Sequence, residues 1–466
     1  MFGYKKTLTA TLRAGLVVSV TIALLYVPVV PVANAAVAVQ GVQPAIMMAL
    51  GIGISLLISL VIINGKQNKF ANNRIAHRPP AEFRADWRDR LPRFMQPFLT
   101  WLMGYPYPGQ KPSFPLKHWT LAVGFWGSVC VLGIASTFCL LNVAGFALVA
   151  LPVSMLLTVS GARALQVHIC HQGIHKNLSG NPRIDRIVVE VISTVIVVQN
   201  FDGYEHDHDG IHHPRLASDE DPDLKFILGV MNLKPWLTKQ ANRKRFFKAL
   251  ISPKIHALFL AGRLRANFVT SPLYRRLMSL GWLLLVVAAV LASGMWLEFI
   301  VGCVLPMTGL YAMSAMAQFY TEHFWVEKRK AGQSAKQHFT SLLVNRHLGD
   351  PLPPSDAPAI YWFALWIMWW ARLFLYHLPI RLGVLPANLP VHGGHHLWPL
   401  DKGWTNSVFT FRRLAEETGT TPREIAGSFG FVLDTMLEAF SESSPPPADQ
   451  GPAMTTVEAM KIVVGM

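Results

Sequence analysis

Histidines are the residues most able to do chemistry in this sequence, because they recur in three short clusters. The clusters read HQGIH, HDGIHH and HGGHH, and a single histidine stands in QFYTEHFW between the last two. Imidazole is the commonest protein ligand for transition metals, and a spacing of three or four residues puts two rings on one side of a helical turn. There are more imidazole rings than one metal ion can bind, and the sequence therefore predicts a two-metal centre. Iron is the metal best suited to oxygen chemistry. The histidines concerned are His171, His175, His208, His212, His213, His323, His392, His395 and His396.

The composition places these histidines in a membrane protein. Of the 466 residues, 52% are hydrophobic and only 15% are charged. Several apolar runs approach the ~20 residues that a helix needs to cross a bilayer. The formal charge of +15 would also suit a nucleic-acid-binding protein, but Lys and Arg are concentrated beside the apolar runs. That pattern is typical of cytoplasmic loops next to anionic lipid, so we expect no nucleic-acid partner.

The first 65 residues are expected to hold two membrane helices. Apolar runs extend from about Leu12 to Val32 and from Ala45 to Ile63. The first run ends in Ala-Asn-Ala, which resembles a signal-peptidase site, but we favour an uncleaved helix bent by Pro28 and Pro31. Residues 66–118 form a strongly basic linker, which the positive-inside rule places in the cytoplasm.

Residues 119–400 are expected to form the membrane and metal domain. The shorter run Ile187 to Val198 cannot cross comfortably and should lie in the interface or inside the protein. Longer runs form two helical hairpins, each of which leaves the cytoplasmic side and returns the next histidines to it. The runs are Trp119 to Leu141 with Val143 to about Val159, and Leu277 to Ala292 with Phe299 to Ala317.

The apolar run Ile360 to Leu378 is the ambiguous segment of this domain. It contains four Trp, two Tyr and Arg372, as a helix at the membrane surface would. A single crossing here would carry the HGGHH cluster to the opposite side, although the ligands of one metal centre must converge. We therefore expect the segment to be interfacial or re-entrant.

Residues 401–466 are expected to form a soluble C-terminal tail. The stretch Thr421-Pro422-Arg423-Glu424 has the polar cap, proline and acid of a helix start, which predicts a helix to about Phe440. The Ser-, Pro- and Asp-rich segment Ser441 to Pro452 is expected to be disordered. The predicted fold is therefore all-α, an integral membrane bundle of hairpins with a cap that carries the histidines.

The order HxxxH, HxxxHH, single His and HxxHH resembles the membrane-bound fatty acid desaturase and hydroxylase superfamily, which includes the alkane monooxygenases. The stretches HQGIHKNLSGNPRIDR, HDGIHHPRLASDEDPD and FYTEHFW extend the likeness, which covers about His168 to Trp398. The resemblance implies a di-iron centre in a cytoplasmic cap beneath four to six membrane helices. It also implies that all nine histidines named above are ligands, and that O2 and two externally supplied electrons are used.

This resemblance implies an oxidoreductase that acts on a lipid-like substrate. Removing hydrogen from an unactivated carbon requires a metal-oxygen oxidant, which side-chain acids and bases cannot supply. The leading hypothesis is a fatty acyl desaturase, whose substrate enters from the bilayer. Hydroxylation of an alkyl or acyl chain is the alternative, because both reactions follow the first hydrogen abstraction, and the SDEDPD sequence somewhat favours it.

Other residues near the clusters are expected to support the ligands. His168 and His206 lie off the family spacing, which favours hydrogen bonding over ligation. Relatives often have Asn four residues before the single histidine, where this sequence has Phe319, with Gln318 beside it. Acids that could orient an imidazole are Glu205, Asp209, Asp219, Asp221 and Glu322. Isolated histidines, expected to be ordinary surface or interface residues, are His77, His118, His256, His338, His347 and His377.

The electron source is expected to be a separate protein. The cytochrome b5 motif HPGG is absent, and the four cysteines include no CxxC pair, which excludes a built-in rubredoxin-like carrier or zinc ribbon. A basic cytoplasmic face would attract an acidic ferredoxin-, rubredoxin- or cytochrome-like carrier. Candidate docking charges, which would equally suit lipid headgroups, are Arg243, Lys244, Arg245 and Lys248.

Two other classes of protein fit the histidines less well. A membrane zinc hydrolase would need Glu beside the first histidine, where Gln172 stands and cannot act as a general base. A metal transporter or non-catalytic metal-binding protein predicts polar residues midway through the membrane helices. The hairpin interiors are almost free of charge.

Overall fold

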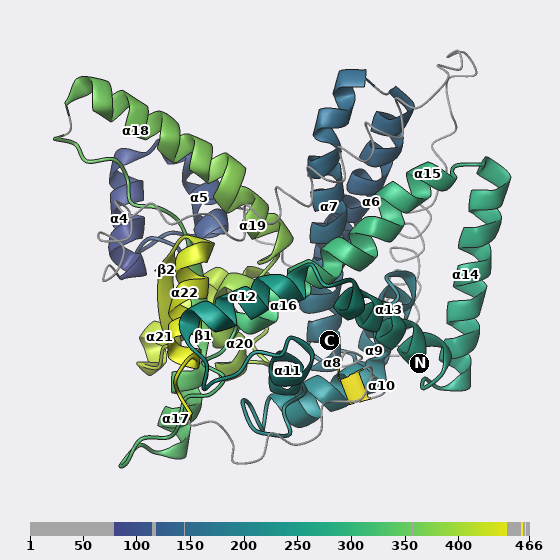
Figure 1. The fold of residues 1–466 in the computed structure, drawn as a ribbon. Helices are drawn as coiled ribbons and strands as arrows, with labels where there is room; N and C mark the ends of the chain where they lie inside the picture. Colours follow the sequence, from purple (N-terminus) through teal and green to yellow (C-terminus); the bar gives the residue numbers. More distant parts are fainter. Residues whose placement is uncertain are drawn as a thin grey trace, which may run out of the picture.

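The computed structural model describes residues 79–113, 118–143, 145–356, 358–444, 458–459 and 462 (Figure 1). The two predicted N-terminal membrane helices lie outside these residues, as do the first part of the basic linker and most of the segment expected to be disordered. The described part is mostly helical, with a single two-stranded sheet. The all-α prediction is confirmed.

Five helical segments of the described chain are long and apolar enough to cross a membrane. They confirm the predicted apolar helices of both hairpins and add the ambiguous Trp-rich segment. Three of them are assembled from shorter helices joined end to end, with π-helical turns between. The segments are α6 (Trp119–Val143); 147–174, with α7 (Leu151–Ala164), η3 (Leu165–Cys170) and α8 (His171–Ile174); α14 (Leu273–Ser293); 296–320, with α15 (Trp296–Phe299), η6 (Ile300–Val304), η7 (Pro306–Leu310) and α16 (Tyr311–Tyr320); and 362–383, with α18 (Ala359–Arg372), η8 (Leu373–His377) and α19 (Leu378–Gly383).

Small residues allow α6 and α7 of the first hairpin to pack closely. A Cβ atom added at Gly133 would lie 2.3 Å from the backbone N of Thr158, and one added at Gly161 would lie 2.4 Å from the backbone N of Cys130. Close backbone approach of this kind is how helices associate in lipid, where apolar burial offers little driving force. The packing holds the second helix rigidly, and the first histidine cluster stands at its end.

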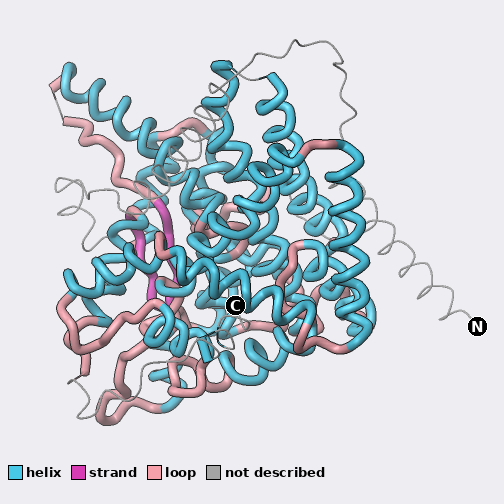
Figure 2. Tube along the Cα trace, turned by 45° about the vertical axis from the view of Figure 1, so that its right-hand side comes forward, coloured by secondary structure: helices cyan, strands magenta, loops and turns pink. Residues whose placement is uncertain are grey.

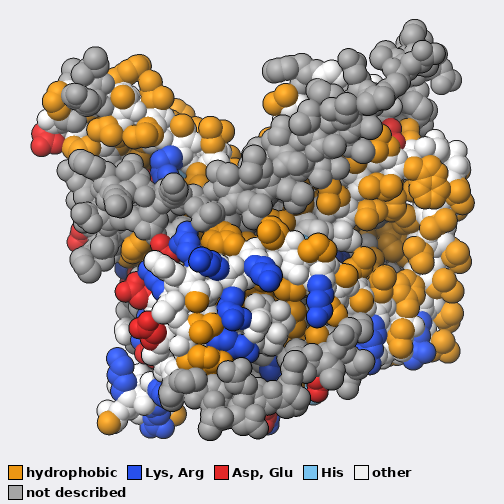
Figure 3. Space-filling view, in the orientation of Figure 1, with side chains coloured by type: hydrophobic (Ala, Val, Ile, Leu, Met, Phe, Trp, Pro, Cys, Tyr) orange, Lys and Arg blue, Asp and Glu red, His pale blue; other side chains and the backbone are white. Residues whose placement is uncertain are grey.

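The two helices of the second hairpin diverge. Helix α14 stands apart in Figure 1, and hydrophobic side chains cover it in Figure 3, with Lys and Arg gathered near its lower end. Its buried Arg275 donates 2.6 Å and 2.9 Å hydrogen bonds to the carbonyl and carboxylate of Glu190 in α9 (Pro182–Val195). Helix α9 contains most of the short apolar run, and it packs inside the protein with Val188, Val189 and Ile192 buried.

The cap consists of short helices around a parallel pair of strands, β1 (Val344–Leu348) and β2 (Arg423–Gly427). The predicted helix start at Thr421 is therefore wrong. Residues 423–427 are extended because β1 offers them a buried partner, and the helix begins only after Ser428, whose Oγ accepts a 3.2 Å hydrogen bond from the Phe431 N–H. Its predicted end at Phe440 is confirmed. The cap helices are α10 (Phe201–Tyr204), η4 (Glu205–His212), α11 (Pro222–Lys225), η5 (Phe226–Val230), α12 (Lys239–Leu250), α13 (Pro253–Phe268), α17 (Ala335–Leu342), η9 (Leu389–Val391), α20 (His392–Leu397), η10 (Trp404–Asn406), α21 (Ser407–Thr418) and α22 (Phe429–Phe440).

The Trp-rich helix α18 is reached through an extended loop. From β1 the chain runs outward along residues 349–356, and α18 then leads it back toward the cap (Figure 2). The HGGHH cluster thus stays beside the other histidines, as convergence requires. That α18 is interfacial or re-entrant remains a prediction.

Helix α18 packs with α4 (Pro80–Arg90) and α5 (Gln96–Met103) in a hydrophobic cluster, and a polar cluster around Asp350 joins α18 to α4. The indole N–H groups of Trp87 and Trp369 both donate to the Asp350 carbonyl, at 3.2 Å and 3.1 Å. The Asp350 carboxylate accepts 2.6 Å and 2.8 Å hydrogen bonds from Arg372 and His377. His377 is 1% exposed, and so is His347 in β1, so the prediction that these two are ordinary surface or interface residues is wrong. A histidine that stands alone in the sequence can still be buried or paired in the fold, and the sequence does not reveal this.

Candidate metal centre

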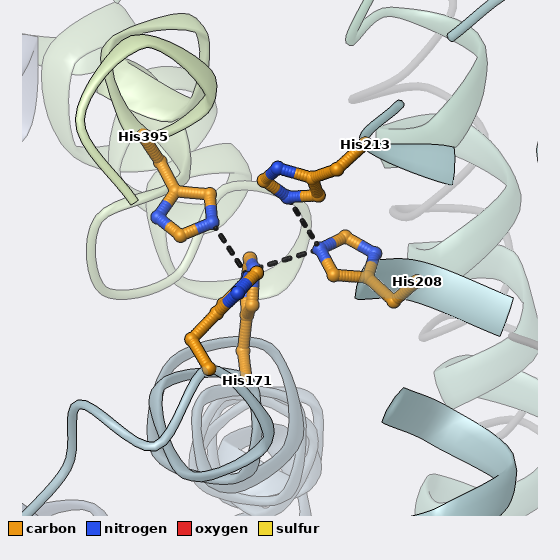
Figure 4. A group of neighbouring side chains, drawn as sticks. His171, His208, His213 and His395 are labelled. Carbon is orange, nitrogen blue, oxygen red and sulfur yellow. Dashed lines mark hydrogen bonds between the residues drawn. The ribbon is translucent and has the colours of Figure 1, made fainter. Parts of the chain in front are cut away.

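Three segments far apart in the sequence bring the histidine clusters together. His171 and His175 stand at the end of the second membrane segment, His208 and His212 lie in the π-helix η4, and His392, His395 and His396 lie in α20. Figure 4 shows His171, His208, His213 and His395 pointing toward one another from these three segments. The single His323 follows α16 and forms an isolated bridge with Leu343, just before β1.

The histidines form two groups, each able to hold one metal ion. Within each group the candidate ligand nitrogens lie within 4.8 Å of one another. We call them the five-histidine group, made of His171, His175, His208, His213 and His395, and the four-histidine group, made of His212, His323, His392 and His396. The stacked rings of His213 and His396, with centroids 4.2 Å apart, connect the groups.

The spacing of the ring nitrogens is that of ligands around an ion. The Nε2 atoms are 2.8 Å apart for His171 and His208, 3.1 Å for His175 and His395, and 3.1 Å for His392 and His396. Two nitrogens at right angles, each ~2.1 Å from a metal, would be about 3 Å apart. His212 Nε2 and both ring nitrogens of His323 are buried without a hydrogen-bond partner, which is costly unless something binds there.

Glycines let the third cluster reach the others. A Cβ atom added at Gly393 would lie 3.0 Å from backbone atoms of Val344 and 2.9 Å from Cβ of Pro422, and one added at Gly394 would lie 2.8 Å from the Phe411 ring. Helix α20 thus packs directly on β1 and on the start of β2. The residues between the histidines of HGGHH are small because the cap backbone passes there.

Replacing Gly393 by alanine is therefore expected to weaken metal binding. The Val344 backbone belongs to a buried strand and cannot move aside, so α20 and its three histidines must shift. We expect roughly 10- to 100-fold lower metal affinity, the range typical when the groups supporting a ligand are disturbed. Equilibrium titration of the metal-free protein would measure it. Gly124→Ala in α6, where a Cβ atom would meet nothing within 4 Å, is the matched control; equal affinities for both variants would contradict the prediction.

Carboxylates orient two of the imidazoles. His212 Nδ1 lies 3.1 Å from the Asp221 carboxylate and 3.4 Å from that of Asp223, and His175 Nδ1 lies 3.1 Å from that of Asp209. Such contacts fix the ring so that the other nitrogen faces the metal. The expected contacts of Asp209 and Asp221 with imidazoles are confirmed, whereas the contact of Asp223 was not predicted from the sequence. Its place in the same Asp-Pro-Asp turn, where Asp221 accepts a 2.9 Å hydrogen bond from the Asp223 N–H, was the available signal.

Burial sets the protonation of most of these histidines. Loss of water, reinforced by neighbouring imidazoles, lowers the pKa of His208, His213 and His395 well below the usual value, and the same holds for His323, His392 and His396. They are neutral at physiological pH, as metal ligands must be. His212 differs: burial lowers its pKa, but Asp221 and Asp223 outweigh burial and raise the pKa to about 9.

Metal binding at the four-histidine group is therefore expected to depend on pH. Below pH 9, His212 in the metal-free protein holds a proton that the metal must displace, so affinity should rise by up to about tenfold per pH unit as the pH approaches 9. Titration with Co²⁺ between pH 7 and 9 would measure this slope. Asp221→Asn removes the main charge that holds the proton and should flatten the slope. A constant affinity across this range in the unaltered protein would contradict the prediction.

A small cavity of about 30 Å³ lies between the two groups and the membrane helices. Ligands of both groups line it, with Val167, Phe319 and Leu389 as apolar walls and Gln318 and Glu322 as polar ones. The side-chain amide of Gln318 accepts a hydrogen bond from Arg163 and donates one to the Glu322 carboxylate. That carboxylate lies 3.6 Å from His392 Nε2. Phe319 thus lines the cavity at the position where relatives often have Asn, and the neighbouring Gln318 provides the polar group there.

The remaining candidates lie around the centre rather than in it. His168 is buried with its ring 4.9 Å from that of Trp404, and His206 is exposed. Glu205 forms a 2.8 Å ion pair with Lys176, and Asp219 is exposed, so within the described residues neither contacts an imidazole of the two groups. Trp404, from the predicted tail, was not identified from the sequence.

The comparisons with known proteins agree with this geometry. No curated protein matches the chain. The sequence model of the family described as fatty acid desaturase matches residues 145–423, more than half of the chain, from the 3-10 helix η2 (Gly145–Ala150) before α7 to the first residue of β2. The match contains all nine histidines and the carboxylates that contact them. This integral membrane protein, with its two groups of converging imidazoles, belongs to the fatty acid desaturase family.

Proposed function

We propose that the protein is an O2-dependent di-iron oxidoreductase that desaturates the acyl chain of a lipid-like substrate. The observation that carries this proposal is the division of nine converging imidazoles into two adjacent groups with ligand spacing. Mostly buried imidazoles, two of them supported by carboxylates, suit two ions of a redox-active metal. Family membership supports an oxidoreductase that acts on fatty acyl chains.

The residues present fit two iron ions. Each group offers at least four nitrogens, and the carboxylates on the outer nitrogens of His175 and His212 make those rings better donors to a cation. The five-histidine and four-histidine groups would each hold one ion. Bound iron would supply the O2-derived oxidising power that acid and base side chains lack.

The chain's own contribution is to position the substrate and exclude water. The cavity between the groups has room for about one water-sized group, and its apolar walls are Val167 and Phe319 from membrane segments and Leu389 from the cap. A carbon held there would lie next to ligands of both groups. Positioning of this kind decides which carbon of a chain reacts.

The two electrons would come from a separate carrier protein, and the cap would face the cytoplasm. Both expectations come from the resemblance and from the cationic segments beside the apolar runs. Arginines and lysines favour the cytoplasmic side of a membrane, and the described cap carries many of them, including the α12 stretch Asn-Arg-Lys-Arg.

Lipid profiling tests the proposal. We expect cells that express the protein to contain acyl chains with a new double bond, detected by mass spectrometry, and cells without it to lack them. Added oxygen without a new double bond would instead establish hydroxylation, the alternative reaction of this chemistry. No oxidised lipid, or purified protein that contains zinc in place of iron, would overturn the proposal in favour of hydrolysis or metal binding.

A further inference from the structure

One wall of the metal centre reaches the protein surface. Among the nine histidines, only His208 and His213 are partly exposed, whereas the other seven are buried. His208 lies within the π-helix η4 and His213 directly follows it. Within the described residues, the outer side of η4 is therefore the place where solvent comes closest to the ligands.

The outer side of η4 is acidic. Its first five residues, Glu-His-Asp-His-Asp, include three carboxylates. Glu205 is paired with a lysine, but within the described residues neither Asp207 nor Asp209 forms an ion pair with Lys or Arg. Asp207 accepts a 2.7 Å hydrogen bond from the neutral amide of Gln199, and Asp209 contacts the imidazole of His175. Two carboxylates that no Lys or Arg neutralises therefore lie beside the partly exposed ligands.

The surface is also open at this point. Gly210 is exposed, and a Cβ atom added there would meet only the Glu205 carbonyl at 3.8 Å and His206 Nδ1 at 3.9 Å. The neighbouring Asp209 side chain is 44% exposed, whereas Asp221, which supports the four-histidine group, is 0% exposed. A small ion can therefore approach the five-histidine group from this side.

The α12 face of the cap has the opposite charge. Only Arg243 among four neighbouring cations of this helix is in an ion pair, with Asp434. The four cations are Arg243, Lys244, Arg245 and Lys248. A metal cation approaching α12 would be repelled, so the two faces differ in the sign of the ion that they attract.

We infer that the metal ions enter the centre as hydrated divalent cations across the η4 face, over Asp207, Asp209 and Gly210. The inference rests on the proposed function, which needs two iron ions. Charge complementarity argues for this occupant, because uncompensated carboxylates attract a doubly charged ion and raise its rate of association. The imidazoles of His208 and His213 can then replace water molecules of the arriving ion, a step that involves no change of oxidation state.

A charge series at Gly210 tests the inference. The variants Gly210→Glu, Gly210→Gln and Gly210→Lys add side chains of similar length with negative, neutral and positive charge, and the open surface has room for them. Metal-free full-length protein in detergent would be mixed with Co²⁺ by stopped flow. The ligand-field absorption of the bound ion would give the rate of uptake, and a separate equilibrium titration would give the affinity.

We expect Co²⁺ uptake to be about tenfold slower in Gly210→Lys than in Gly210→Glu, with Gly210→Gln between them and the affinity changed less than twofold. The difference should largely disappear in about 1 M salt, where the Debye length is only ~3 Å. Lys244→Glu with Lys248→Glu should leave the rate unchanged. Faster uptake in that double variant, without a response at Gly210, would place the entry at α12 and overturn the inference.

Asp207→Asn is a second test that adds no side chain. Asparagine can still accept the hydrogen bond from Gln199 but carries no charge, so uptake should slow about threefold. Asp356→Asn, which removes an exposed charge from the loop before α18, is the matched control and should have no effect.

Two results would overturn the inference and one would contradict the proposed function. Equal uptake rates across the Gly210 series and in Asp207→Asn would show that ions do not enter over η4. An affinity that changes as much as the rate would show that the added charge acts on the bound ion and not on its entry. Failure of the unaltered protein to bind two Co²⁺ ions would instead contradict the two-metal centre of the proposed function.

Discussion

The His212→Ala variant is expected to form no detectable oxidised lipid, a loss of at least ~100-fold in product. The Nε2 atom of His212 faces the four-histidine group and has no hydrogen-bond partner. Its Nδ1 atom contacts the carboxylates of Asp221 and Asp223. Without the ring, one metal loses a ligand and two buried carboxylates lose their cationic partner. Mass spectrometry of lipids and iron analysis of the purified protein would measure both consequences.

His206→Ala is the matched control for this experiment. His206 lies in the same π-helix, is exposed and belongs to neither group, so its loss should change product and iron content by less than twofold. We expect His212→Ala to retain about half of the iron, because the five-histidine group is left intact. Normal product from a His212→Ala protein that is folded and lacks that iron would contradict the role of the four-histidine group.

The Arg346→Met variant is expected to lose about 3–5 kcal/mol of stability, the range for breaking a buried charge network. The Arg346 guanidinium is fully buried and donates to the Gln318 carbonyl at 3.1 Å, the Thr321 hydroxyl at 3.0 Å and the Leu389 carbonyl at 2.8 Å. It also lies 3.8 Å from the Glu322 carboxylate. Methionine fills part of the space but removes three buried hydrogen bonds and the positive charge beside the Glu322 carboxylate.

Thermal unfolding in detergent, followed by circular dichroism, would measure this loss. Arg413→Met is the matched control, because Arg413 pairs with Glu417 on the exposed surface of α21, where such pairs contribute only about 0.5 kcal/mol. We further expect Arg346→Met to bind metal more weakly, since Arg346 ties the end of α16, before His323, to η9, before His392. Unfolding temperatures that match in the two variants would show that the buried network contributes little.

The sequence predicts those parts of this protein that depend on local pattern. Apolar runs of spanning length predicted both hairpins, and the spacing within each cluster predicted which histidines share a helical turn. The two hairpins predicted that the first two clusters and His323 lie on one side of the membrane, whereas the HGGHH cluster was placed with them by requiring that metal ligands converge. These features need no knowledge of which distant residues touch.

Features that depend on distant partners could not be predicted in this way. Residues 423–427 look like a helix start, and only β1 makes them a strand. His347 and His377 look isolated, yet one lies in that buried strand and the other contacts Asp350. Likewise, the carboxylate of Asp223 reaches His212 because the Asp-Pro-Asp turn folds back on η4, a contact that spacing alone does not reveal.

The parallel pairing of β1 with β2 sets the order in which the pocket can be completed. The HGGHH helix rests on Val344 from one strand and on Pro422, just before the other, so its final position depends on residues made after the histidines themselves. During translation the described membrane segments and eleven of the twelve cap helices named above emerge before β2, with the histidines held only loosely. The metal centre should therefore be completed only after the ribosome has made β2 and it has paired with β1.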